Sequence, residues 1–164
     1  MKIRLLGTLL GLAINFAVPT SIAQDAMKVV TADEVVWKDD TLFKGVRIAN
    51  LLGDPAKVET VVMRVKFPPN FKIPLHTHPV TEVITVLSGT FWDSMGDETK
   101  KGVMLKTGSL LVIPPNHTHS VWTTDEETII QLSFTGPFDI TFINPADDAK
   151  KSRIIKHARS TTTP

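Results

Sequence analysis

The sequence predicts an all-β domain that folds as a sandwich or a barrel. From Val35 to Phe142, short stretches rich in Val, Ile, Thr and Phe are separated at fairly regular intervals by turn residues. No long amphipathic helical pattern interrupts this series. A composition of 42% hydrophobic and 21% charged residues is that of a soluble globular domain. One domain is therefore expected.

The segment 61–67 shows the strand pattern most clearly. Its apolar side chains share one face of an extended chain and its two cations share the other, as in a half-buried strand. Proline, glycine and acidic turns separate nearly all of the other candidate strands. Those strands are expected over 42–49, 82–87, 90–92, 102–105, 109–113, 120–123, 128–134 and 138–143.

The first 23 residues have the layout of a secretory signal peptide. Lys2 and Arg4 precede an uncharged apolar run from Leu5 to Val18, and a small residue, Ala23, ends the polar stretch that follows. We expect cleavage between Ala23 and Gln24 and a secreted or periplasmic mature protein. The alternative is an uncleaved membrane anchor, although the run is shorter than the ~20 residues that span a bilayer as a helix.

The expected organisation is a signal peptide at 1–23, a folded domain at 24–146 and a basic tail at 147–164. The tail is expected to be solvated and flexible, and a basic arm on anionic lipid is the alternative. Loss of two cations with the signal changes the net charge from +1 to −1, which gives no argument for a nucleic-acid partner. Cysteine is absent, so any metal must be held by nitrogen and oxygen.

Four of the five histidines fall in two close pairs, which are the most informative feature of the sequence. His76 and His78 form one pair and His117 and His119 the other, and residues two apart in a strand point to the same side. Glu82, like the histidines of the first pair, has an even number. Its side chain can therefore reach the same point as His76 and His78 if the chain folds back between His78 and Glu82. Imidazole and carboxylate together suit one divalent transition metal: iron, manganese, nickel, copper, cobalt or zinc. The alternative is that the histidines serve ordinary surface or core roles.

The residues around the first pair resemble the first signature motif of the cupin superfamily. That motif runs glycine, five residues, H-x-H, three or four residues, glutamate, six residues and glycine. In this chain Asn70 takes the first glycine position, and every later gap is matched by His76, His78, Glu82 and Gly89.

The region of the second pair resembles the second cupin motif, which runs glycine, five residues, P-x-G, two residues, histidine, three residues and asparagine. Its positions are taken here by Gly108, Pro114, Asn116, His119 and Thr123, three of them by identity and all by spacing. The spacing selects His119 rather than His117 as the ligand. Asn in place of Gly at positions 70 and 116 is a mild change, because Asn tolerates the left-handed backbone conformation.

The resemblance covers roughly 58–142 and implies a fold and a metal site. The implied fold is a cupin-type jelly-roll β-barrel of two packed antiparallel sheets. The implied metal ligands, inside one mouth of the barrel, are His76, His78, Glu82 and His119. The stretches 92–97 and 136–148 are similar to small exported bacterial single-domain cupins.

Cupins with a site of three histidines and one glutamate include dioxygenases of the quercetinase kind, oxalate-degrading enzymes, isomerases and lyases, and also sugar-binding proteins and sensors. The fold alone does not choose among them. The leading hypothesis is an exported metalloenzyme, dioxygenase-like or a Lewis-acid isomerase or lyase, acting on a small oxygen-rich organic molecule. The alternative is a non-catalytic periplasmic small-molecule-binding or sensor cupin. A homodimer formed through edge strands is expected.

Candidate acid and base groups are few, because the chain has no tyrosine and no cysteine. The remaining candidates are His117, Gln131, Asp93 and Arg64. His117 is either a proton carrier beside the metal ligands or a solvent-facing loop residue. Trp92 and Trp122 flank the two motifs, and they either form an aromatic wall for the substrate or pack in the core.

Overall fold

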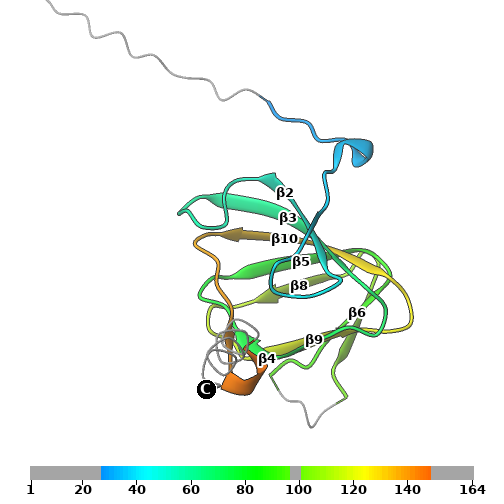
Figure 1. Cartoon of the computed structure of the whole chain (residues 1–164), viewed down its shortest axis with the longest axis vertical. Helices are drawn as coiled ribbons and strands as arrows, with labels where there is room; N and C mark the ends of the chain where they lie inside the picture. The colour runs from blue at the N-terminus through cyan, green and yellow to red at the C-terminus, as the bar shows by residue number, and fades with distance from the viewer. Residues whose placement is uncertain (1–26, 97–100, 149–164) are drawn as a thin grey trace, which may run out of the picture.

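Two antiparallel sheets packed face to face form the fold (Figure 1). The computed structural model describes residues 27–96 and 101–148. One sheet contains, in spatial order, β1 (Lys38–Asp39), β2 (Arg47–Leu52), β3 (Thr60–Phe67), β10 (Thr128–Thr135), β5 (Glu82–Ser88) and β8 (Leu110–Ile113). The other contains β11 (Thr141–Phe142), β4 (Lys72–Thr77), β9 (His119–Thr123), β6 (Thr90–Asp93) and β7 (Val103–Lys106). The prediction of an all-β jelly-roll barrel is confirmed.

Helical structure in the described ranges is confined to two short 3-10 turns, η1 (Ala32–Glu34) and η2 (Pro145–Asp147). Over the same ranges, no helix has the length and apolar character needed to cross a bilayer. The expected signal peptide at 1–23 and the expected basic tail beyond residue 148 lie outside the described residues. Both therefore stay predictions.

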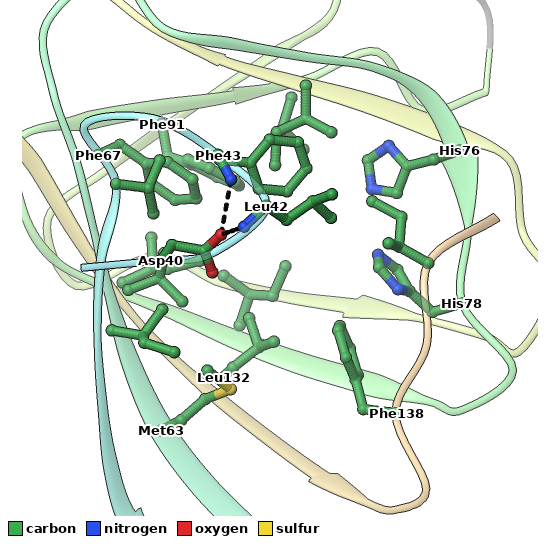
Figure 2. Close-up of a pocket in the computed structure, with 18 of the residues that line it drawn as sticks. Asp40, Leu42, Phe43, Met63, Phe67, His76, His78, Phe91, Leu132 and Phe138 are labelled. Carbon is green, nitrogen blue, oxygen red and sulfur yellow. Dashed lines mark hydrogen bonds between the residues drawn. The ribbon is translucent and has the colours of Figure 1, made fainter. Parts of the chain in front are cut away.

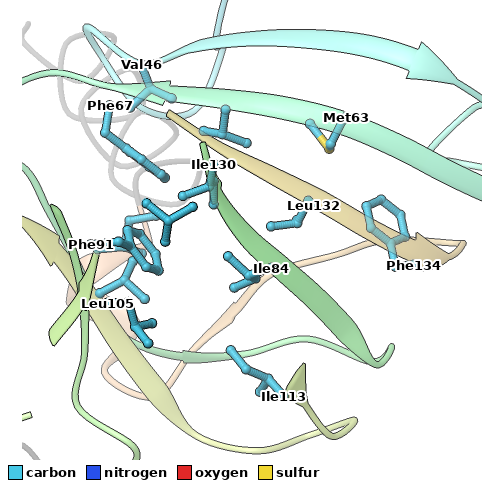
Figure 3. Packing of buried hydrophobic residues seen from close by; sticks show 14 of the residues in the cluster. Val46, Met63, Phe67, Ile84, Phe91, Leu105, Ile113, Ile130, Leu132 and Phe134 are labelled. Atoms are coloured by element: carbon cyan, nitrogen blue, oxygen red, sulfur yellow. The ribbon is translucent and has the colours of Figure 1, made fainter. Parts of the chain in front are cut away.

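The hydrophobic core lies between the sheets (Figure 3). In β3 the buried side chains are those predicted from the alternation, from Val61 at 0% exposure to Phe67 at 4%. The partner strands follow the same period of two, with Ile84 and Val86 buried in β5 and Leu132 in β10. Each such side chain contributes ~1.5–3 kcal/mol when it is fully buried. We therefore expect the barrel to fold without help from a metal.

The segment Asp40–Val46 forms a loop, so the expected strand over 42–49 is wrong in its first half. The Asp40 carboxylate accepts hydrogen bonds from the backbone N–H groups of Leu42 and Phe43, at 2.6 and 2.7 Å. Gly45 has φ +86°, which turns the chain, and strand pairing begins only at Arg47. Backbone N–H groups that donate to a nearby side chain are not available for hydrogen bonds to a neighbouring strand, so such a side chain disfavours strand formation.

Strand β4 was absent from the expected strands, and it carries a β-bulge. The register between β4 and β9 shifts between Ile73 and His76, so that Pro74 and Leu75 together oppose the single residue Ser120. Because a bulge inserts one residue, it changes which side chains face inward. Ile73 and His76, three residues apart, are consequently both buried. The expected strand over 138–143 is also shorter, because only Thr141–Phe142 pairs. The other expected strands are confirmed to within one residue at each end.

Two asparagines occupy the left-handed backbone conformation, at the motif positions where glycine was expected. Asn70 has φ 55° and Asn116 has φ 59°. The Asn116 N–H also donates to the His78 carbonyl oxygen at 2.7 Å, which ties the two histidine-bearing loops together. Substitution of Asn for Gly at these positions therefore preserves the turn.

We expect Asn116→Ala to lower the free energy of unfolding by about 1–2 kcal/mol, because alanine has a Cβ but lacks asparagine's tolerance for this conformation. Asn116→Gly should stay within about 0.5 kcal/mol of the wild type, because glycine adopts positive φ without strain. Urea unfolding of the three proteins measures the difference. Equal stability of the alanine and glycine variants would show that the conformation at this position imposes no constraint.

Candidate metal centre

Three histidine side chains come together at one end of the barrel interior. His76 on β4 pairs directly with His119 on β9, and His78 follows at the end of β4. Each ring offers one nitrogen, and these three atoms lie within 4.8 Å of one another. All three residues are buried, with exposures of 1%, 6% and 2% for His76, His78 and His119. The structure thus brings together the three histidines that the cupin motifs indicated.

The other ring nitrogen of each histidine is held by an acceptor. The Nδ1 of His76 lies 2.6 Å from the Pro74 carbonyl oxygen in the bulge, and the Nδ1 of His78 lies 2.7 Å from the Asp139 carbonyl oxygen. Since a carbonyl oxygen can only accept, both Nδ1 atoms carry the proton. Each neutral ring then presents the Nε2 lone pair, which is the form that binds a metal.

Burial favours this neutral form. Burial is the main cause that lowers the pKa of His76 to about 3, and the neighbouring His119 lowers it further. Burial likewise lowers the pKa of His78 to about 4, against an ordinary value of 6.5. Both rings are therefore neutral at physiological pH, with the Nε2 lone pair available.

Glu82 approaches the histidines from the opposite sheet. It begins β5, is 3% exposed, and places its Oε1 3.7 Å from His78 Nε2 and its Oε2 3.6 Å from His119 Nε2. Glu82 Oε2 and His119 Nε2 are buried without a hydrogen-bond partner. Orphaned polar atoms of this kind are costly, and a divalent cation between them would satisfy both. The residues present therefore fit a metal ion.

Asp93 contacts the cluster from behind His119. Its Oδ2 lies 2.9 Å from His119 Nδ1, and its Oδ1 accepts from the Met95 N–H at 2.6 Å. Asp93 is 1% exposed. It is suited to orienting the His119 ring, since it lies on the side of the ring away from Nε2. Its candidacy as a catalytic acid or base stays a prediction.

The other candidate acid and base residues lie away from the cluster. His117 is exposed in the loop before β9, which matches the solvent-facing alternative. Arg64 on β3 and Gln131 on β10 are cross-strand partners whose side chains lie 3.5 Å apart. Arg64 and Gln131 alternate with buried core residues along their strands, so their side chains face outward. The positions of His117, Arg64 and Gln131 therefore give no support to a catalytic role.

Trp92 and Trp122 stack on each other, with ring centroids 5.7 Å apart and an interplanar angle of 14°. Each alternates with inward-facing residues, Phe91 and Asp93 on β6 and Val121 on β9, so the pair lies on the outer face of its sheet. Neither tryptophan is among the residues that line the cavity at the histidines or among those of the hydrophobic core cluster.

A cavity of about 150 Å³ in the barrel interior reaches the three histidines (Figure 2). The close-up shows His76 and His78 at one end and Phe67 and Phe91 at the other. The loop at 40–46 supplies Asp40, Leu42 and Phe43 to the lining, which is otherwise almost wholly apolar. A second pocket of about 230 Å³ shares Leu42 and Ile140 with it.

Sequence reasoning missed this cavity and the two carbonyl anchors. A carbonyl oxygen has no signature in the sequence, because every residue carries one. The cavity depends on Phe43 and Leu42, which lie in a segment where the sequence predicts a strand. The signals for a loop there are the acidic side chain of Asp40, which can accept from nearby N–H groups, and Gly45.

Comparison with known proteins agrees with this geometry. The sequence matches the ChrR cupin-like domain family over residues 25–139, which is more than half of the chain. The chain belongs to that family. Its membership confirms the cupin superfamily that the two histidine motifs indicated. No curated protein sequence matches it.

Solved cupin structures share the fold at low sequence identity. The polyketide cyclase RemF from Streptomyces resistomycificus is 20% identical, with a TM-score of 0.61 over 76% of this chain and 90% of that one. An RmlC-like cupin from Ralstonia eutropha JMP134 is 12% identical, with a TM-score of 0.60 over 82% and 88%. The DMSP lyase DddQ from Ruegeria pomeroyi DSS-3 is 20% identical, with a TM-score of 0.56 over 69% and 63%. At these identities the likeness establishes the fold.

The Glu82 carboxyl should make the metal-free protein less stable as the pH rises. Burial is the main cause that raises its pKa from 4.5 to about 7. The folded state therefore binds this proton more tightly than the unfolded chain, so the stability it contributes is present below pH 4.5 and is lost as the pH rises through about 7. In metal-free buffer, Glu82→Gln should exceed the wild type by about 1–3 kcal/mol at pH 8 and by much less at pH 5.

Urea unfolding at both pH values, with a chelator present, measures this difference. Asp125→Asn is the matched control, because Asp125 lies exposed in the loop before β10 and its neutralisation should change stability equally little at both pH values. A Glu82→Gln protein that is no more stable than the wild type at pH 8 would contradict the prediction.

Proposed function

We propose that this protein holds one divalent transition metal with His76, His78, Glu82 and His119, and that it is an enzyme acting on a small organic molecule at that ion. The observation that carries the proposal is that Glu82 Oε2 and His119 Nε2, 3.6 Å apart, are both buried without a hydrogen-bond partner. Two polar groups in an apolar barrel need a partner, and a cation supplies it.

The donor set limits the metal. Three imidazoles and one carboxylate favour iron, manganese, nickel, copper, cobalt or zinc, which accept mixed nitrogen and oxygen ligands. Four protein ligands leave coordination positions for a substrate in an octahedral ion. Such an ion would supply Lewis-acid polarisation of chelating oxygens or a centre for dioxygen chemistry.

The chain's own residues would hold and orient this centre. The Pro74 and Asp139 carbonyls and the Asp93 carboxylate fix the three rings through their Nδ1 atoms. Fixed rings keep the Nε2 atoms converging, which lowers the cost of ordering them when the ion binds. The apolar lining of the cavity excludes water from the side on which a substrate would lie.

The alternative is a non-catalytic small-molecule-binding or sensor cupin, and one observation favours it. Among the described lining residues, the only acid or base group besides the histidines is Asp40, whose carboxylate already accepts two backbone hydrogen bonds. Both bonds fall on Oδ1, so besides the histidines a proton-transfer reaction would have only the Asp40 Oδ2 atom among these lining residues. Enzymes such as the similar polyketide cyclase and DMSP lyase support the barrel as a host for catalysis, without indicating the substrate.

We expect the purified protein to contain about one equivalent of a transition metal, and His119→Ala to remove most of it. His117→Ala should retain the metal, because His117 is exposed and lies outside the cluster. It is the matched control, because it is also a histidine and lies only two positions from His119 in the chain. Elemental analysis of the three proteins tests this. Equal loss from both variants would mean that the ligand assignment is wrong.

Turnover separates the enzyme from the binding protein. The metal-loaded protein is incubated with catechols, flavonols, diketones and organic acids, and both oxygen uptake and product formation are followed. An enzyme should lose turnover in His119→Ala and keep it in His117→Ala. Binding of one of these compounds without product would favour the sensor alternative.

We further propose that the protein is exported, with cleavage between Ala23 and Gln24, on the basis of the charged start and apolar run of residues 1–23. Mass spectrometry of the mature protein should give an amino terminus at Gln24. Intact Met1 in a membrane fraction would instead establish the anchored alternative.

A homodimer is also proposed, supported by the edge strand β8, where Leu110 and Val112 are 61% and 51% exposed.

A further inference from the structure

We propose that Asp40 decides which ligand the barrel cavity accepts, by binding the single hydrogen-bond donor of a small and otherwise apolar molecule. The donor is a hydroxyl or an N–H group on a body about the size of one aromatic ring. It meets the Asp40 carboxylate and not the histidines, so no metal takes part in this contact. The inference goes beyond the proposed function, because Asp40 belongs to neither histidine motif.

Asp40 differs from the rest of the cavity wall. Apart from the three histidines, the other lining residues in the described part of the chain are all Phe, Leu, Ile, Val or Met. Asp40 is half-buried, in the loop between β1 and β2. A few well-placed polar groups in an apolar pocket give a binding site its specificity. On its side of the cavity, the Asp40 carboxylate is therefore the group that distinguishes ligands of equal size.

The loop holds this carboxylate in place. Its Oδ1 accepts from the N–H groups of Leu42 and Phe43 at 2.6 and 2.7 Å, and the Asp40 N–H donates to the Val46 carbonyl oxygen at 2.9 Å. Both side-chain bonds fall on Oδ1, so Oδ2 is left as an acceptor. Because the orientation of the side chain is set before a ligand arrives, binding to Oδ2 requires little further ordering of the protein.

Asp40 and the histidines lie on different sides of the cavity. Figure 2 shows Asp40 on one side and His76 and His78 on the other. Phe67 and Phe91, stacked with centroids 5.8 Å apart, lie on the Asp40 side. They offer an apolar surface to the body of a ligand whose donor binds Oδ2. The contact is thus separate from the candidate metal centre.

The size and polarity of the cavity limit the rest of the ligand. Its volume is about 150 Å³, which holds a molecule the size of benzene. A carboxylate oxygen can only accept, so it pairs with a donor. Further hydroxyl groups on this side, as on a sugar, would meet apolar walls, and buried polar groups without partners are costly. A ligand carboxylate there would meet the like charge of Asp40, which is also unfavourable.

Phenol and toluene are a matched pair of probes, because they have nearly the same shape and only phenol carries a donor. Both are titrated into the protein as purified, and binding is measured by calorimetry. In Asp40→Asn, the ratio of phenol affinity to toluene affinity should fall at least about tenfold, the loss expected for one hydrogen bond to a charged group. Toluene affinity should stay close to that of the wild type, because toluene has no donor to lose.

Asp40→Asn is chosen because its side-chain oxygen can still accept from the two loop N–H groups, which leaves the amide NH₂ in the place of Oδ2. Asp39→Asn is the matched control, since Asp39 is the adjacent residue, its side chain is 93% exposed, and it lies outside the cavity lining. Its affinity ratio should equal that of the wild type. An unchanged ratio in Asp40→Asn, or an equal fall in both variants, would overturn the inference and leave the metal proposal untouched.

The wild-type protein decides the case in which Asp40→Asn disturbs the loop and weakens the binding of both probes. The carboxyl ¹³C resonance of Asp40 is assigned and followed during each titration. It should shift on saturation with phenol and move much less with toluene, because only phenol donates to the carboxylate. Equal shifts with the two probes would overturn the inference.

Discussion

The burial of three histidines and a glutamate side by side inside a largely apolar barrel is the constraint on which the rest of the structure depends. Three imidazoles and one carboxylate are each less than 7% exposed. Leaving an ionised carboxylate there costs several kcal/mol, which is a large part of the stability of a small domain. The apolar core offsets this cost, because each fully buried aliphatic or aromatic side chain contributes ~1.5–3 kcal/mol. The fold thus owes its stability to the apolar core, and that stability is large enough to tolerate the buried polar side chains of the site.

Both sheets are needed to assemble the site. β4 and β9 carry His76 and His119 as direct neighbours, and the bulge at Pro74 turns His76 inward and supplies the carbonyl that holds its ring. Glu82 comes from the facing sheet, at the start of β5. Packing of the core between the sheets therefore determines the distance between the carboxylate and the imidazoles, and any change in that packing changes the site.

The cavity and the site share their walls. The histidines that would bind the metal also close one end of the apolar cavity, and the loop that begins at Asp40 covers it. This loop is closed by its own side chain, since Asp40 holds the N–H groups of Leu42 and Phe43. The size of the cavity is in this way affected by a segment far in sequence from the two histidine motifs.

The sequence by itself determined the fold class, the inward face of β3 and the three clustered histidines. These features are periodic or lie at short fixed spacings, and strand geometry alone converts a spacing of two into a shared face. Asn70 and Asn116 were also interpreted correctly as turn residues, because the left-handed conformation is a local property. Tertiary structure alone decided that Asp93 holds His119, that the tryptophans face outward, and that the 40–46 loop closes a cavity. Each of these depends on which strands become neighbours, and long-range pairing leaves no local spacing in the sequence from which it could be predicted.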